Sequence, residues 1–222
     1  MLINADFSKR VIVEPGVEPG QYAWVASPQN GVERIMLDRI GAEQARATSI
    51  VRYAPDSHFP PHEHPGGEEI LVLSGTFSDE TGDFPAGWYL RNPPGTSHQP
   101  SSRDGALIFV KLRQMASDDE SSVRIDTRRA SAWWRGEDRM VCPLFSNPVE
   151  QVCLQRVEAG RMILTDQAGG TELLVLEGRI VDGGLSYKPG TWIRLPPGDL
   201  PGFTAGEKGV RFYQKTGHLA AG

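Results

Sequence analysis

Four side chains that can bind a metal ion form the most informative pattern in the sequence. His62, His64 and Glu68 lie close together, and His98 follows further along the chain. Neutral imidazole and carboxylate groups suit zinc, iron, manganese, nickel or copper. We therefore expect these four residues, the predicted ligands, to hold one divalent metal ion. For an isolated His-x-His the simpler interpretation is an exposed pair in a proline-rich loop, but Glu68 and His98 argue against it.

The chemistry of such a site depends on the metal. A divalent ion with three neutral imidazoles and one carboxylate keeps one net positive charge. If the ion is six-coordinate, two positions remain for water, dioxygen or a substrate oxygen, which supports oxygen chemistry or Lewis-acid activation. Four protein ligands nearly fill the tetrahedron that zinc prefers, which suits stability or sensing. The residues alone do not select among zinc, iron, manganese and nickel.

The spacing indicates how the predicted ligands would meet. On an extended strand alternate residues point to the same face, so His62, His64 and Glu68 share a parity. His98 would then reach them from a different strand. The intervening Glu63 should face outward.

Composition narrows the class of protein. The chain has 222 residues, 39% of them hydrophobic and 23% charged, which is ordinary for a soluble globular protein. A net charge of −5 argues against a nucleic-acid partner. No segment resembles a secretory signal or a membrane span, and two cysteines without a signal favour the cytoplasm.

The chain repeats itself at an offset of 103 residues. Residues 66–75 are matched by 169–178, and the Pro-Pro-Gly at 93–95 by that at 196–198. Gly87 matches Gly190, Arg91 matches Arg194, and Phe109 matches Phe212. Duplication of one supersecondary unit explains this pattern. A polar, acidic linker at 115–122 predicts a first domain over 1–115 and a second over 123–222.

Each copy has the features of β structure. Glycine (25) and proline (17) are spread along the chain and favour short strands joined by turns. Residues 48–53, 70–73 and 107–110 are rich in branched and aromatic side chains, and no long amphipathic helix is evident. Apolar residues on both faces of 68–73 predict a strand covered on both sides. The alternative is an open sandwich without a ligand cavity.

The second copy lacks the metal chemistry. At the same offset the predicted ligands become Thr165, Gln167, Thr171 and Pro201, while the surrounding glycines and prolines persist. We expect one metal ion per chain, in the first copy. The second is then a packing partner or a pocket of another kind, and we favour the packing role.

These motifs resemble the cupin superfamily, which implies two tandem jelly-roll barrels, or double-stranded β-helices. The first cupin motif places a glycine, His-x-His, a glutamate and a glycine in order. His62, His64, Glu68 and Gly75 fit it, with Asp56 in place of the leading glycine. The second motif is matched at four positions, with Ser102 in place of the usual asparagine; the matching residues are Gly87, Pro93, Gly95 and His98.

Within that superfamily the chain most resembles the cupin domain of ChrR-type anti-sigma factors. The segments that carry the resemblance are 62–73, 77–80 and 91–98. It implies zinc bound by the four predicted ligands. In that family sigma binding belongs to a helical N-terminal domain, whereas residues 11–13 here are β-like. A sigma factor is therefore not an expected partner of this chain alone.

Several other polar residues receive weaker expectations. Glu69 should point away from the metal, His58 should lie in a pocket or on the surface, and His218 should be a capping or surface group. Cys142 and Cys153 flank the turn-like Asn147-Pro148. A hairpin with an even loop would place the two thiols opposite each other. Two unpaired thiols are the more common arrangement.

Three function classes remain. The first is a sensor or small-ligand-binding module that responds to a small molecule or an oxidant. The second is a metal-dependent small-molecule dioxygenase. The third is a structural or interaction protein in which the metal only stabilises the fold. The fold alone does not select among these three classes. Association into a homo-oligomer is compatible with each of them.

Overall fold

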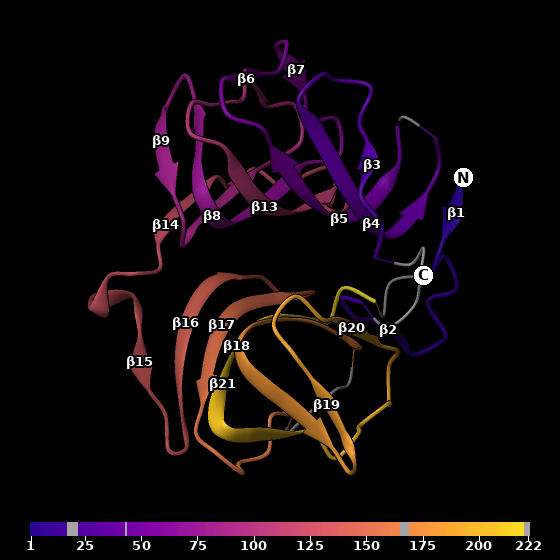
Figure 1. Ribbon diagram of the computed structural model, residues 1–222, viewed down its shortest axis with the longest axis vertical. Coiled ribbons are helices and arrows are strands. Elements are labelled where there is room, and N and C mark those ends of the chain that lie inside the picture. Colours follow the sequence, from indigo (N-terminus) through magenta and orange to yellow (C-terminus); the bar gives the residue numbers. More distant parts are fainter. Residues whose placement is uncertain (17–21, 43, 165–168, 220–222) are drawn as a thin grey trace. The chain divides into compact units, whose positions relative to one another are not determined.

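The computed structural model describes residues 1–16, 22–42, 44–164 and 169–219, which form two compact units (Figure 1). The first unit comprises Met1–Ala5 and Gly20–Arg128, and the second comprises Asp6–Pro19 and Arg129–Gly222. Among the described residues the regular structure is β, apart from the short 3-10 helix η1 (Ala130–Ala132). None of the described helical structure is long and apolar enough to cross a membrane.

The first unit is built on one curved sheet. Its strands follow the order β1-β4-β5-β13-β8-β10-β14, and β7 and β11 pair separately. Short strands β3, β6, β9 and β12 attach to this framework. The bounds are β1 (Leu2–Ile3), β3 (Val25–Ala26), β4 (Val32–Ile40), β5 (Arg46–Tyr53), β6 (Ser57–His58), β7 (His62–Glu63), β8 (Glu68–Asp79), β9 (Gly82–Pro85), β10 (Trp88–Asn92), β11 (Ser97–His98), β12 (Ser101–Ser102), β13 (Ala106–Leu112) and β14 (Val123–Asp126).

The second unit repeats this plan. Its strands follow the order β15-β16-β17-β21-β18-β20-β2, with β19 paired to β18. The bounds are β2 (Val11–Val13), β15 (Trp134–Arg135), β16 (Arg139–Ser146), β17 (Gln151–Val157), β18 (Thr171–Asp182), β19 (Leu185–Tyr187), β20 (Trp192–Leu195) and β21 (Thr204–Thr216).

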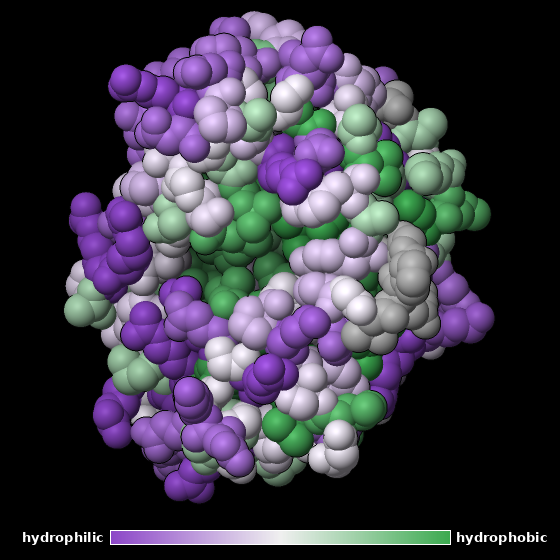
Figure 2. All heavy atoms as spheres, viewed as in Figure 1, coloured by the Kyte–Doolittle hydropathy of each residue, from purple (hydrophilic) through white to green (hydrophobic). Residues whose placement is uncertain are grey.

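The all-β prediction is confirmed, but the sheets do not close into barrels. The ladder of the first unit ends at β1 and β14, and that of the second ends at β15 and β2. Each unit is therefore a cupin-like β-sandwich. Charged and polar side chains cover much of the surface seen in Figure 2, as a content of 23% charged residues leads one to expect.

The two units differ from the expected domains at both ends. The N-terminal β2 pairs with β20 and so belongs to the second unit. In turn β14 follows the acidic segment 115–122 but pairs with β10 of the first unit. The acidic segment thus lies within the first unit, because β14, which comes after this segment in the sequence, still pairs with a strand of that unit.

Each unit has an apolar core on one face of its sheet. In β8 the side chains of Ile70 and Val72 enter the core, and the strand is buried on both faces from Glu68 to Val72, as predicted. The first core contains Val32, Tyr53, Ile70, Val72, Phe77, Phe84, Leu90, Ala106, Ile108 and Val110. The second contains Val157, Ile163, Leu164, Leu173, Val175, Ile180, Tyr187, Ile193, Leu195, Phe203, Ala205, Val210 and Phe212.

The long central strands show the duplication in atomic detail. Gly75 in β8 has φ 68° and Gly178 in β18 has φ 72°. A Cβ at Gly75 would lie 2.0 Å from the carbonyl oxygen of Gly105, and one at Gly178 would lie 2.1 Å from that of Gly209. Only glycine fits either position, which explains why this residue persists in both copies.

The offset of 103 does not hold throughout. Leu71 pairs with Phe109, and its counterpart Leu174 pairs with Tyr213 rather than Phe212. The counterpart of Phe109 is therefore Tyr213, at an offset of 104. One residue has been added between the Pro-Pro-Gly at 196–198 and this part of β21.

Buried charges also repeat. Glu69 lies between Arg91 and Lys111 in the strand register, and Glu172 lies between Arg194 and Lys215. All six are at most 3% exposed, which charged side chains rarely are without partners. Charge matching across neighbouring strands stabilises this face of each sheet.

The two cysteines are not joined. Cys142 lies opposite Leu154, and Cys153 lies opposite Pro143, so the thiols are one register position apart. A bulge between Pro143 and Phe145 shifts the pairing near the turn. Because adjacent strand residues face opposite sides, the two thiols point apart and both are free.

Candidate metal centre

The four predicted ligands come from three short segments of the first unit. His62 in β7 lies directly opposite His98 in β11, and their ring centroids are 4.9 Å apart. His64 follows β7, where its backbone N–H donates to the Thr96 carbonyl at 2.8 Å. Glu68 begins β8. The main chain therefore positions all four.

These side chains converge as predicted. One ligand atom from each of His62, His64, Glu68 and His98 lies within 4.8 Å of the others. His64, Glu68 and His98 are buried, and His62 is half-buried. The Nε2 atoms of His64 and His98 lie 3.3 and 3.4 Å from Oε2 of Glu68. Within the described part of the chain no second group of this kind is found.

The strand-parity argument grouped residues that do converge, but for a partly wrong reason. The chain does not run extended from His62 to Glu68, because β7 ends at Glu63 and a turn intervenes before β8. The turn through Pro65, closed by a hydrogen bond from Gly67 N–H to the His64 carbonyl at 3.2 Å, redirects the chain. Glu68 meets the histidines because of this reversal.

Hydrogen bonds at the far side of each ring define its tautomer. The Pro60 carbonyl lies 3.2 Å from Nδ1 of His62 and can only accept. The Thr96 hydroxyl donates to the Pro93 carbonyl at 2.7 Å and so accepts from Nδ1 of His64 at 3.0 Å. In each neutral ring Nδ1 therefore carries the proton and the Nε2 lone pair is available.

His98 follows the same rule, with a carboxylate as its partner. Oδ2 of Asp79 lies 3.4 Å from Nδ1 of His98, and Asp79 is almost fully buried. A carboxylate behind a ligating histidine fixes the ring and makes Nε2 more basic. This arrangement leaves Nε2 of His98, like that of His64, buried with no hydrogen-bond partner among the described residues.

The titration of these groups reflects the same contacts. Burial lowers the pKa of His64 and outweighs the charge of Glu68, which acts in the opposite direction. Burial alone would lower the pKa of His98, but the hydrogen bond to Asp79 and the charge of Glu68 raise it overall. The pKa of Asp79 is about 2, because hydrogen bonds from His98 and Thr81 more than offset its burial.

Glu68 is held from behind as well. Asn92 lies opposite it in the β10–β8 register and donates from Nδ2 to Oε2 at 3.0 Å. Arg124 in turn donates to Oδ1 of Asn92 at 2.7 Å. The position of the Glu68 carboxylate is thus fixed by side chains from two further strands, β10 and β14.

The donor set fits a divalent cation. Two Nε2 lone pairs face a carboxylate oxygen across a small buried space, an arrangement that repels unless a proton or a metal ion lies between them. Three imidazoles and one carboxylate match the preferences of zinc and of the other transition metals named above. Glu68 would neutralise one of the two charges of the ion.

The sequence reasoning missed the residues that orient the ligands. Asp79, Asn92, Thr96 and Arg124 contact the predicted ligands or their partners, but the sequence reasoning gave them no role. A signal was present for three of them, because Asp79, Asn92 and Thr96 lie in the segments 77–80 and 91–98 that carry the family resemblance. Arg124 lies outside those segments and is found only from the structure.

The remaining polar residues behave variously. Glu69 points away from the centre, as expected, and its Oε1 accepts a hydrogen bond from Tyr89 at 2.8 Å. Glu63 and His58 are exposed, and His58 lies outside the ligand group. The expectation for His218 is wrong, because its side chain is buried with Nε2 3.3 Å from Oε1 of Glu172.

A cavity of about 410 Å³ adjoins the centre within the first unit. His62, His64 and Glu68 form part of its wall. The rest combines apolar core side chains such as Val51 and Ile108 with polar ones, among them Arg34. Concave pockets lined by apolar side chains and a few polar groups are the usual form of small-molecule sites.

The second unit has a different interior. Thr171 occupies the start of β18 as Glu68 does that of β8, Pro201 lies outside any strand, and Thr165 and Gln167 lie outside the described residues. A cavity of about 620 Å³ is present there, with Cys153, Gln155 and Gln214 on its wall. In the first unit the corresponding register positions hold Ser49, Val51 and Val110.

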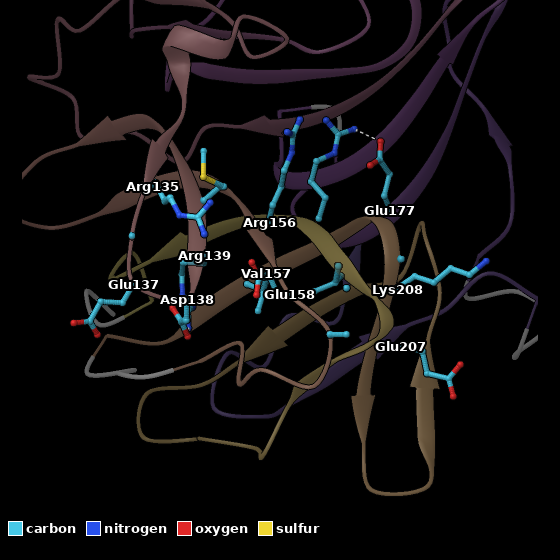
Figure 3. Close-up of a pocket in the computed structure, with 17 residues that line it drawn as sticks. Arg135, Glu137, Asp138, Arg139, Arg156, Val157, Glu158, Glu177, Glu207 and Lys208 are labelled. Atoms are coloured by element: carbon cyan, nitrogen blue, oxygen red, sulfur yellow. Dashed lines mark hydrogen bonds and ion pairs between the residues drawn. The ribbon is translucent and has the colours of Figure 1, made fainter.

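Another pocket of the second unit, of about 510 Å³, carries many charges (Figure 3). The charges largely compensate one another. Arg211 pairs with Glu177 at 2.7 Å, and Arg139 pairs with Asp138 at 2.8 Å. Arg156 lies over the ring of Trp133, 4.1 Å from its centroid. These pairings leave no converging set of reactive groups in the part of this pocket that the structure describes.

Comparison with known proteins agrees with this geometry. The family model of the ChrR cupin-like domain matches residues 13–116, the part of the chain that contains all four predicted ligands. Residues 13–116 of this chain therefore belong to the cupin superfamily. The first unit resembles the ChrR cupin domain, and the match ends before β14. No relative was found among curated protein sequences.

Solved cupin structures resemble the chain over most of its length. A proposed dioxygenase from Nostoc punctiforme has a TM-score of 0.74 and 14% identity, with 97% of this chain and 85% of that chain covered. The pirin YhhW of Escherichia coli, in complex with nickel(II), has a TM-score of 0.67 and 9% identity, with 94% and 98% covered. A mutant salicylate 1,2-dioxygenase from Pseudoaminobacter salicylatoxidans has a TM-score of 0.60 and 12% identity, with 78% and 71% covered. At these identities the likeness establishes the cupin fold.

Proposed function

We propose that this cupin holds one divalent metal ion through His62, His64, Glu68 and His98 and binds a small molecule beside it, in a sensing or regulatory role. The observation that carries the proposal is the convergence of the four ligand atoms within 4.8 Å. The match to the ChrR cupin-like domain favours zinc as the ion. The adjoining cavity of about 410 Å³ supports a small organic ligand.

The protein residues have distinct parts in this proposal. The metal, when bound, supplies a Lewis acid with one net positive charge. Asp79 and Thr96 orient the rings of His98 and His64, and Asn92 orients the carboxylate of Glu68. The apolar wall of the cavity excludes water from the ligand, which strengthens electrostatic interactions at the site.

A metal-dependent dioxygenase is the second candidate. It is supported by the cavity beside the predicted ligands and by the similar structures of a proposed dioxygenase and of salicylate 1,2-dioxygenase. Three histidines and one carboxylate leave coordination positions open on a six-coordinate iron or manganese ion. Zinc without turnover supports the sensing role, and iron with substrate-dependent oxygen uptake supports the enzyme.

Metal content of protein purified without added metal tests the centre. We expect about one equivalent per chain in the wild type and a large loss in His98→Ala, since removal of one ligand weakens binding. His58→Ala is the matched control, because His58 is an exposed histidine of the same unit. Full occupancy in His98→Ala, or an equal loss in His58→Ala, contradicts the four-ligand assignment.

A further inference from the structure

The cavity beside the predicted ligands contains a cationic side chain that has no hydrogen-bond or ion-pair partner among the described residues. Arg34 in β4 lines it together with His62, His64 and Glu68. Its Nε atom is buried and has no hydrogen-bond partner among the described residues, and no described carboxylate forms an ion pair with it. A guanidinium with a buried donor left unpaired is costly unless an acceptor reaches it.

The strand register places Arg34 on the inner face of the sheet, which also carries Glu68, but far from the predicted ligands. Arg34 lies opposite Val51, Val51 lies opposite Ile108, and Ile108 lies opposite Val72 in β8. Val72 is four residues beyond Glu68 on the inner face of that strand. Arg34 is thus three strands across the sheet and four register positions along it from the proposed metal.

The surface between these two points is mostly apolar, with the side chain of Ser49 as its polar member. Val51 and Ile108 separate Arg34 from β8 in the register, and Val32 and Val110 also line the cavity. Two other arginines line the cavity: Arg39 donates to the Ala42 carbonyl, and Arg113 lies at the metal end, where its backbone N–H donates to the Gly67 carbonyl at 3.0 Å. Arg52, the next residue after Val51, faces the opposite side and pairs with Glu33 at 2.5 Å.

We propose that the cavity binds a small organic acid, with its carboxylate on Arg34 and its apolar body against Val51 and Ile108, on the side of Arg34 that leads to the metal centre. The guanidinium can offer paired donors to a carboxylate, a geometry that an ammonium cannot provide. The two positive ends of the cavity, the arginine and the metal centre, favour an anion over a neutral molecule. The proposal rests on the proposed function for the role of the metal end.

The organic-acid proposal is tested by comparing two acids with the matching amides. The acids are benzoate and hexanoate, and the amides are benzamide and hexanamide. Calorimetry on the full chain loaded with zinc should show both acids binding and both amides binding at least about tenfold more weakly, because a charge-assisted pair is lost. Arg34→Gln should weaken the acids about tenfold or more and leave the amides unchanged. Arg34→Lys should recover part of the affinity. Arg52→Gln is the matched control and should behave as the wild type.

The outcomes separate the two proposals. Absence of acid binding to the wild type, or equal acid binding in wild type and Arg34→Gln, overturns the organic-acid proposal. Zinc content of each variant, measured on the same samples, tests the metal centre independently, and Arg34→Gln should keep it. Loss of zinc in the wild type would refute the proposed function, whereas preference for acids over amides would still be measurable in the metal-free protein. Thermal melting confirms that each variant is folded.

Discussion

His62 and His98 face each other across the antiparallel pair of β7 and β11, with ring centroids 4.9 Å apart. The backbone hydrogen bond from His64 to Thr96 lies beside this pair. Main-chain pairing therefore brings the second cupin motif to the first. Side chains behind the rings then set the direction of each Nε2 atom, and they can be altered without removing a ligand.

Asp79→Asn tests the carboxylate behind His98. Loss of the negative charge should weaken zinc binding about 10- to 100-fold, the range found for partners of ligating histidines. The measurement is competition with a chromophoric chelator. Asp83→Asn is the control, because exposed Asp83 accepts a hydrogen bond from Ser78 in the same hairpin. Equal effects of the two substitutions would contradict an orienting role for Asp79.

Thr96→Val tests the acceptor for His64. Valine keeps the shape but removes the oxygen that accepts from Nδ1, so the ring loses its fixed tautomer and zinc affinity should fall about tenfold. Thr96→Ser keeps the hydroxyl and should restore most of the affinity. The same chelator competition reports both variants. If serine is no better than valine, the methyl group rather than the hydroxyl matters at this position.

Gly75→Ala and Gly178→Ala should each destabilise the unit that contains the substitution. A Cβ would lie about 2 Å from a carbonyl oxygen at both positions, and φ is positive. We expect a loss of about 3 kcal/mol or more in the free energy of unfolding. Gly183→Ala has a positive φ but no atom within 4 Å, so its cost should be about 1 kcal/mol. Urea unfolding distinguishes steric overlap from backbone strain.

The thiols should be unreactive in the native protein at pH 8. Burial raises the pKa of Cys142 to about 11, and that of Cys153 also to about 11, so little thiolate is present. Because the thiol pKa is higher in the folded state than in the unfolded state, the unfolded chain loses its thiol protons first as the pH rises. The free energy of unfolding should therefore fall between about pH 9 and pH 11. Alkylation followed by mass spectrometry should show slow native labelling and two labels after denaturation without reductant. One or no label in the denatured chain would reveal a disulfide.

The ligands were predictable because metal binding restricts residue types severely. Imidazole and carboxylate groups in a fixed order are rare, so His62, His64, Glu68 and His98 stand out in the sequence. Their partners were not predictable, because aspartate, asparagine, threonine and arginine occur everywhere on protein surfaces. Asn92 acquires its role only from the β8–β10 register, and Arg34 only from its place on the inner face of β4.

The internal repeat could be recognised in the sequence at positions where the backbone conformation permits only one residue type. Gly75 and Gly178 are retained because a side chain would collide with the next strand, which keeps the offset constant nearby. The offset changes in β21, where a loop before the strand absorbed an extra residue. Strand parity likewise failed between His64 and Glu68, since a turn can reverse the chain without a clear signal in its residue types.

The pairing of β2 with β20 affects how this chain can be dissected. A fragment beginning at residue 129 would lack β2 and leave the hydrogen-bonding edge of β20 bare, beside Trp192 and Ile193. Bare edges of this kind recruit other chains, so the excised C-terminal half should self-associate. A peptide spanning residues 6–16, supplied in trans, should restore a monodisperse fragment by completing that edge.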